Sequence, residues 1–190
     1  MKKLFLSLSI FACFCSLKAQ IITYDVSVKY AYSATGLLNK SISDLGASQD
    51  YDVAFSSNYG FAGTFNFGKI GVGIECLLGN FKAGYQGDQA LLGGAYTSEV
   101  NLKTTQIPIY LRLGGSKGSF GEFGVVMNNV SGASYTNNNS LIDPPQATDV
   151  SNQYQNFMGY MVGVGRRFGL LDLPVMVSVS GRFMYSTADA

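Results

Sequence analysis

Six charged side chains are the residues of this sequence best placed to do chemistry. Each lies in a short segment in which polar and large apolar residues alternate, on the side of the segment that carries Gly, Ser, Thr or Asn. Three are acids and three are bases: Asp25, Lys29, Glu75, Arg112, Glu122 and Arg182. Such a set could form a proton path or polar conduit, or a network of ion pairs that fills the interior. Because a charge buried without a partner is costly, we expect the six to pair with one another.

Other candidates for catalysis are few. The chain contains no histidine, the commonest acid–base group and a common metal ligand. Beyond residue 20 the only cysteine is Cys76, so we expect neither a disulfide framework nor a cysteine metal cluster. Cys76 alternates with apolar residues and is better interpreted as a small apolar side chain than as a reactive thiol. Several glycines lie at alternate positions of the predicted strands, which indicates room for bulky neighbours rather than a phosphate loop: Gly71, Gly73, Gly159, Gly163 and Gly165. We therefore expect no catalytic residue, no metal and no cofactor.

The first 19 residues have the pattern of a secretory signal peptide. Lys2 and Lys3 precede an apolar stretch over 4–17, and Ala19 is the expected residue before the cleavage site. An apolar stretch of this length is too short for a membrane anchor, which needs about 20 residues. A lipoprotein signal, cleaved before one of its two cysteines, is disfavoured by the phenylalanines beside them.

The composition of the remaining chain is unusual for a soluble domain. Without the signal it holds ten basic and twelve acidic residues, so it presents no excess of positive charge to nucleic acid. Charged residues are 13% of the chain, about half of the ~25% typical of globular proteins. No apolar run beyond the signal reaches the length of a spanning helix. Low charge without such a helix is typical of a transmembrane β-barrel.

Strict alternation of polar and apolar residues recurs in seven segments and predicts seven strands. The polar face is mostly Gly, Ser, Thr and Asn, which is too small and uncharged for a solvated exterior and suits a crowded lumen. The apolar face is then expected to contact lipid. An eight-stranded barrel has a lumen only wide enough for side chains, which favours the ion-pair network over the conduit. The segments are 22–32, 54–67, 70–79, 106–114, 122–128, 158–165 and 175–185.

Turn residues predict how neighbouring segments pair. Gly68-Lys69 fits a two-residue hairpin turn with Gly first, which sets Phe65 opposite Val72. The next glycine-rich turn sets Arg112 opposite Glu122. Both registers keep charged and apolar residues on separate faces, and a slip of one residue would mix them.

The connections between segments alternate between long and short. The long ones are expected at 33–53, 80–98 and 129–152, and the short ones join the opposite strand ends. Outer-membrane barrels have this asymmetry, with short periplasmic turns and longer external loops. It places the mature N-terminus in the periplasm and the three long loops outside the cell. Within its strand, Pro108 removes a ladder donor and predicts a bulge.

Four features together resemble a known family. They are a secretory start followed by a strand with alternating Tyr, then QIPIYLRLG at 106–114, GYMVGVGRRFG at 159–169 and VSVSGRFMYS at 177–186. This pattern is similar to the small outer-membrane β-barrel family of Bacteroidetes, which includes PorT-like proteins. The resemblance covers nearly the whole mature chain. It implies an all-β, antiparallel, up-and-down transmembrane barrel over residues 20–190, and it brings no catalytic or ligand-binding residue with it.

The sequence leaves several functions open. The first hypothesis is a non-enzymatic barrel with a structural or interaction role, surrounded by outer-membrane lipid, whose loops 33–53, 80–98 and 129–152 meet protein or surface partners. The second is transport of small solutes. A third is a barrel enzyme that acts on lipid, which the sequence allows only if its mechanism does not use histidine. A secretion-associated role is what the resemblance to PorT-like proteins implies.

The strand count predicts one more strand. Single-chain bacterial barrels have an even number of strands, and an open edge leaves backbone groups unpaired in hydrocarbon. We therefore expect eight strands, with the chain continuing past Ala190 into a strand that closes onto 22–32. The alternatives are a missed strand within 90–102 or a strand donated by a second chain.

Overall fold

The computed structural model describes residues 22–36, 50–89, 94–114, 118–138, 147–169 and 175–186. Nearly all of them lie in β-strands, together with one short 3-10 turn, η3 (Ser151–Gln153). No helix in these ranges is long and apolar enough to cross a bilayer. The expected signal peptide, 1–19, lies outside the described residues. The strands are β1 (Ile22–Thr35), β2 (Asp50–Asp52), β3 (Ala54–Phe67), β4 (Ile70–Gln89), β5 (Gly94–Gly114), β6 (Gly118–Asn138), β7 (Ala147–Asp149), β8 (Phe157–Gly169) and β9 (Met176–Ser186).

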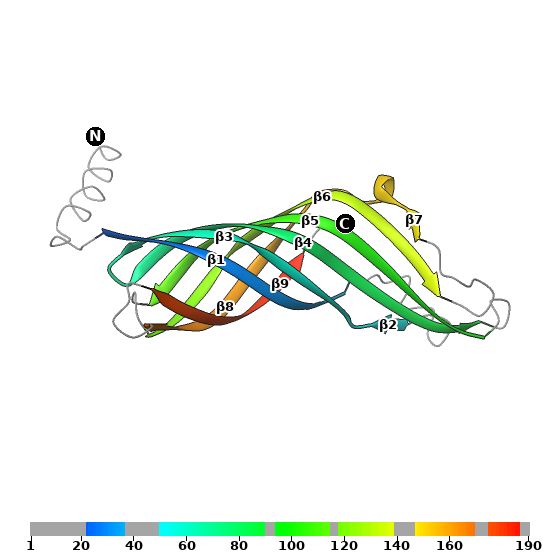
Figure 1. Cartoon of the computed structure of the whole chain (residues 1–190), viewed down its shortest axis with the longest axis horizontal. Helices are drawn as coiled ribbons and strands as arrows, with labels where there is room; N and C mark the ends of the chain where they lie inside the picture. Colours follow the sequence, from blue (N-terminus) through cyan, green and yellow to red (C-terminus); the bar gives the residue numbers. More distant parts are fainter. Residues whose placement is uncertain are drawn as a thin grey trace, which may run out of the picture.

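Seven long strands form one antiparallel sheet in the order β1-β3-β4-β5-β6-β8-β9. The short β2 and β7 pair with β4 and β6. Each long strand lies beside the long strands that precede and follow it in the chain, which is the up-and-down order. The sheet curls into a half-barrel whose strands run diagonally to its long axis (Figure 1). The all-β, antiparallel fold is therefore confirmed, and each predicted segment falls on one of the seven long strands.

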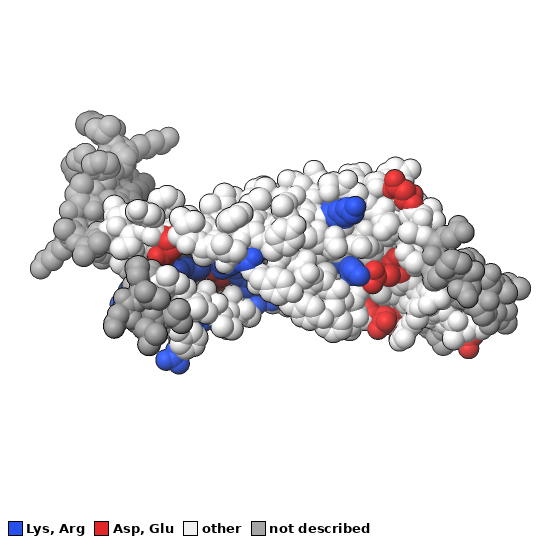
Figure 2. Space-filling view, viewed as in Figure 1, with Lys and Arg blue, Asp and Glu red and all other residues white. Residues whose placement is uncertain are grey.

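The two edges of the sheet, β1 and β9, border a seam. Six antiparallel steps separate them in the strand order, so they run in the same direction. Within the described residues they do not pair with each other. Where β1 and β9 lie in Figure 1, Figure 2 shows charged side chains in a hollow between uncharged atoms. The eighth strand expected from the sequence would lie outside the described residues and stays a prediction.

The two faces of the strands differ as the alternation predicts. Along β3 every second side chain is buried, including Asn58 and Asn66, while Phe61 and Phe65 between them are 67% and 58% exposed. Large apolar side chains point outward along all seven long strands, and Tyr24, Val26, Val28 and Val164 are each more than 70% exposed. Where all seven long strands lie side by side, polar side chains therefore predominate inside and apolar side chains cover the outside.

Both predicted hairpin registers are confirmed. Phe65 pairs with Val72 across the Gly68-Lys69 turn, where Gly68 has a φ of 65° that favours glycine. Arg112 pairs with Glu122 across the β5–β6 connection. Turn residues and face patterning together were sufficient to set these registers.

The bounds of the predicted external loops are wrong. Strands β4 and β5 stay paired as far as Gln89 and Gly94, so most of 80–98 is strand rather than loop. Likewise β6 continues to Asn138, and β7 lies within the predicted 129–152 loop. The first loop, 33–53, is shortened by the end of β1 and by β2, and residues 37–49 lie outside the described ranges. The three longest strands thus project beyond the other four.

The prediction of a bulge at Pro108 is also wrong. Ile74 pairs with Ile109 and Leu77 with Gln106, so the register between β4 and β5 is the same on both sides of the proline. Proline removes a donor from the ladder without inserting a residue, and the strand keeps its register. The register shift lies elsewhere, between Lys103 and Thr104 of β5, opposite β6.

Candidate functional site

The charged residues of the lumen form a connected network around Glu75. The guanidinium of Arg182 donates two hydrogen bonds to the Glu75 carboxylate, at 2.6 and 2.7 Å. Lys29 Nζ lies 3.2 Å from Glu75 Oε1. The Glu75 side chain is fully buried. Its two cationic partners, Lys29 and Arg182, come from β1 and β9, the strands on either side of the seam.

Arg182 also connects Glu75 to a second buried carboxylate. Its Nε donates to Glu122 Oε2 at 2.9 Å, while Arg112 donates to Glu122 Oε1 through Nε at 2.9 Å and Nη2 at 2.6 Å. Five of the six predicted residues therefore form one continuous chain of charge pairs, from Lys29 to Arg112. The pairing expected from their types and positions is present.

Asp25, the sixth predicted residue, belongs to a separate pair. Its carboxylate accepts hydrogen bonds from Arg167 Nη1 and Asn66 Nδ2, both at 2.8 Å. Arg167 was not among the predicted residues, because the predicted strand segment 158–165 ends before it. Continuing the alternation of β8 by one step beyond Gly165 would have placed Arg167 inside.

Aromatic rings and glycines complete the interior around this network. The Arg112 guanidinium lies 4.7 Å from the centre of the Phe120 ring, and that of Arg182 lies 5.3 Å from the centre of the Tyr110 ring. A Cβ added to Gly73 would clash with the Tyr110 ring, and one added to Gly165 would clash with that of Phe120. The interpretation that inward glycines make room for bulky neighbours is confirmed at these two positions.

Chemically, the network is a set of cross-links between strands. Glu75 and Glu122 each accept charge-assisted hydrogen bonds on both carboxylate oxygens. Their side chains are fully buried, and that of Arg112 is 4% exposed. Because the carboxylates of Glu75 and Glu122 are already bonded to arginine side chains, they are suited to holding strands together rather than to binding a solute. No group of three or more potential metal-ligating His, Cys, Asp or Glu side chains occurs in the described ranges.

Beyond the polar part of the lumen, the long strands form a sheet extension, defined as 80–89, 94–105 and 129–138. Its inner face carries an apolar core instead of charges. The core is completed by β2, by Tyr154 and by the start of β8, where the Phe157 ring packs edge-on against Phe81 at 6.0 Å. Its buried members are Ala83, Tyr85, Val100, Leu102, Ala133 and Phe157.

The outer face of the sheet extension is polar. Lys82 and Glu99 form an ion pair at 2.9 Å on this face, and Gln86, Thr97 and Lys103 are exposed beside it. The sheet extension therefore has the ordinary arrangement of a sheet in water, with apolar residues inside and polar residues outside.

Both edges of the sheet extension are covered. On the β4 edge, β2 pairs with Tyr85 and its neighbours, and the Thr35 hydroxyl donates to Lys82 O at 2.6 Å and accepts from Lys82 N at 3.2 Å. On the β6 edge, β7 pairs with Tyr135, and Ser151 Oγ accepts from Ala133 N at 2.8 Å. Covered edges do not pair with further strands, so a partner would contact side chains here.

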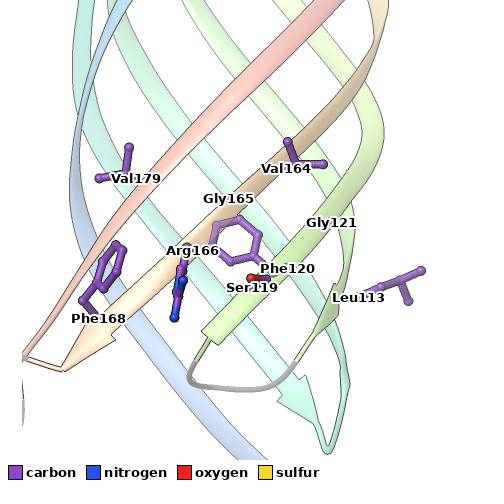
Figure 3. A pocket seen from close by; sticks show the side chains of 9 residues that line it. All are labelled: Leu113, Ser119, Phe120, Gly121, Val164, Gly165, Arg166, Phe168 and Val179. Atoms are coloured by element: carbon purple, nitrogen blue, oxygen red, sulfur yellow. The ribbon is translucent and has the colours of Figure 1, made fainter.

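A shallow hollow of about 690 Å³ lies at the opposite end of the sheet, near the β3–β4 and β5–β6 turns (Figure 3). Its apolar walls come from β5, β8 and β9, with β6 between them. Among the described residues, Arg166 is the one charged side chain that lines it. The principal lining residues are Leu113, Gly121, Val164, Arg166, Phe168 and Val179.

No family model, no curated protein and no solved structure matches the chain. Function must therefore be argued from the lumen, the sheet extension and the outer face.

Proposed function

We propose that this chain is an outer-membrane β-barrel protein of a Gram-negative bacterium, with a structural or interaction role. One observation carries the proposal: outside the sheet extension, the outward side chains of the seven long strands are mostly large, apolar and exposed, while nearly all charged side chains point inward. Tyr24, Val26 and Val28 of β1 are 75–78% exposed, whereas Glu75 and Arg112 are 2–3% exposed. Soluble monomers rarely expose a continuous apolar surface of this extent, and a barrel wall in lipid requires one.

The sheet extension supports the same proposal. Outward residues on β4 are apolar at Val72, Ile74 and Leu78 and become polar from Lys82 onward. A bilayer has a limited thickness, and the apolar band of an outer-membrane barrel is about 25 Å tall. Strands of 20 and 21 residues are long enough to cross this band and continue into water.

Interaction through the sheet extension is favoured over transport of solutes. The residues that would line a channel are instead buried against one another, as for Tyr110, Val126 and Met161. At the far end, Leu102 and Ala83 belong to a packed apolar core. A secretion-associated role, which the likeness to PorT-like proteins implies, would also use the sheet extension as its contact surface.

Topology and localisation are tested together on intact cells. A peptide tag inserted in 139–146, between β6 and β7, is expected to bind antibody from outside the cell, and a tag in 115–117 is expected to be inaccessible. The protein should fractionate with the outer membrane and show heat-modifiable migration. Reversed labelling would refute the orientation, and recovery from the soluble periplasm would refute the membrane proposal.

Transport is tested separately by single-channel conductance in planar bilayers. The buried lumen predicts no discrete conductance steps from the folded protein. Regular steps that disappear on chemical cross-linking of the lumen would favour the transport function instead.

A further inference from the structure

The barrel wall is defined here as the part of the seven long strands between the hairpin turns and the sheet extension. Its described outer face is almost free of charge, and Arg166 is the exception. Among the outward positions of the described strands between the hairpin turns and the sheet extension, no other residue is charged. Arg166 lies on β8, three residues before the strand ends at Gly169, and its side chain is exposed. An isolated cation in an apolar wall is costly unless an anion meets it.

Arg166 differs sharply from its neighbour Arg167. Arg167 points inward and forms an ion pair with Asp25 at 2.8 Å. The Arg166 guanidinium lies over the Phe168 ring at 5.4 Å, and no carboxylate of the described residues pairs with it. Figure 3 shows the Arg166 side chain directed toward the end of the molecule that carries the turns.

The hollow described above adjoins this guanidinium. In Figure 3, Phe168 and Val179 lie on one side of Arg166, and Val164 and Leu113 lie on the other. The floor of the hollow includes Gly121, where an added Cβ would come no nearer to another atom than 3.9 Å. The site thus combines a cation at the turn end with an open apolar surface that continues along the wall.

We propose that this hollow binds one phospholipid of the periplasmic leaflet, with an anionic headgroup on Arg166 and an acyl chain over Gly121. The proposal rests on the proposed membrane location, in which the turn end lies at the periplasmic interface. Arginine suits this role because its guanidinium offers paired donors to a phosphate and remains charged beside apolar groups. A long arginine side chain near the interface also reaches the headgroup level while its stem stays in the apolar layer.

Lipid selectivity beside the hollow tests the proposal. The chain contains no tryptophan, so Phe168→Trp introduces a single fluorescent reporter beside Arg166, and Phe65→Trp introduces a matched one on β3. Both phenylalanines are exposed on the outer face, at 46% and 58%. Each variant is folded into vesicles of brominated phosphatidylglycerol mixed with phosphatidylcholine, and quenching reports which lipid contacts the reporter.

We expect the Phe168→Trp reporter to prefer phosphatidylglycerol about fivefold, which corresponds to about 1 kcal/mol, the effect of one arginine at an anionic surface. The Phe65→Trp reporter should show a ratio near one. Adding Arg166→Gln to Phe168→Trp should remove the preference, and Arg166→Lys should retain most of it. Adding Gly121→Leu should reduce the preference with the charge intact, because it fills the acyl-chain surface.

Two outcomes would overturn the proposal in distinguishable ways. Equal lipid ratios at the two reporters, with both quenched, would mean that the protein is inserted but has no lipid site at Arg166. A failure of brominated lipid to quench either reporter would overturn the membrane proposal and the lipid site with it.

Discussion

The barrel wall and the sheet extension share the three strands β4, β5 and β6, yet their faces have opposite polarity. In the wall, β4 points Val72 and Ile74 outward and Glu75 inward. In the sheet extension the same strand points Lys82 outward and packs Tyr85 into an apolar core. The strand itself continues without a break, so we attribute the inversion near Leu78 to the proposed change of surroundings from lipid to water rather than to a change of fold.

The interior of the wall depends on paired charges, so the largest effect is expected there. Replacing Glu122 with Gln should cost about 3–5 kcal/mol of folding free energy, because it leaves Arg112 and Arg182 buried without this carboxylate. The double variant Arg112→Met, Glu122→Gln should cost less than the sum of the single changes. A double-mutant cycle by urea unfolding in lipid measures this. Additive losses would show that Arg112 and Glu122 do not stabilise each other.

The interior of the sheet extension depends on packing. Leu102 is fully buried, so Leu102→Ala should cost about 2–5 kcal/mol through lost contacts and a cavity. The matched change on the same strand, Leu111→Ala, alters an outward side chain that is 39% exposed and should cost much less. Urea unfolding measures both losses of folding free energy. Equal losses for the two variants would show that the packed core of the sheet extension does not stabilise the protein.

The outer faces should respond oppositely to an added charge. Val162→Arg places a cation on the apolar wall and should cost about 2–4 kcal/mol. Thr97→Arg places one on the polar outer face of the sheet extension and should change stability by no more than about 0.5 kcal/mol. Unfolding in lipid vesicles compares the two. Equal tolerance of both would contradict the polarity inversion.

The smallest effect is a pH dependence of the sheet extension. Burial, together with the nearby hydroxyls of Tyr154, Tyr51 and Tyr135, raises the pKa of Tyr85 to about 12. An unfolded tyrosine ionises near pH 10. The contribution of Tyr85 to stability is therefore complete below pH 10 and is lost as the pH rises toward 12, because the unfolded state releases its proton first.

Tyr85→Phe removes this ionisation. Thermal unfolding between pH 9 and 12 should show a shallower loss of stability for the variant than for the unaltered chain. Identical slopes would indicate that Tyr85 titrates normally in the folded protein.

Sequence reasoning located the wall well because one rule applies throughout it. Alternation with apolar residues outward identified seven long strands, and the Gly68-Lys69 turn fixed the pairing of Phe65 with Val72. The same rule placed all six predicted charges in the lumen, where each has an ion-pair partner.

The rule failed where the polarity inverts. Along the described parts of 80–98 and 129–138 the outward residues are polar or small, as at Lys82, Thr97 and Asn129, so the search for lipid-facing apolar residues interpreted strand as loop. The apolar residues that stabilise these segments, such as Tyr85 and Ala133, point inward. Arg167 was missed because the pattern was stopped one step early, and the eighth strand beyond β9 stays a prediction.

Accessibility of cysteine to a water-soluble maleimide tests the polarity inversion most directly. Cys76 is the single cysteine of the chain beyond residue 20, and the protein itself leaves it exposed on the outer face of the wall. In lipid vesicles we expect Cys76 to react slowly and to become reactive once the protein is unfolded in detergent. In a Cys76→Ala background, Gln86→Cys on the sheet extension should react rapidly. Rapid reaction of Cys76 in folded, vesicle-bound protein would show that water rather than lipid covers the wall, and would contradict the account.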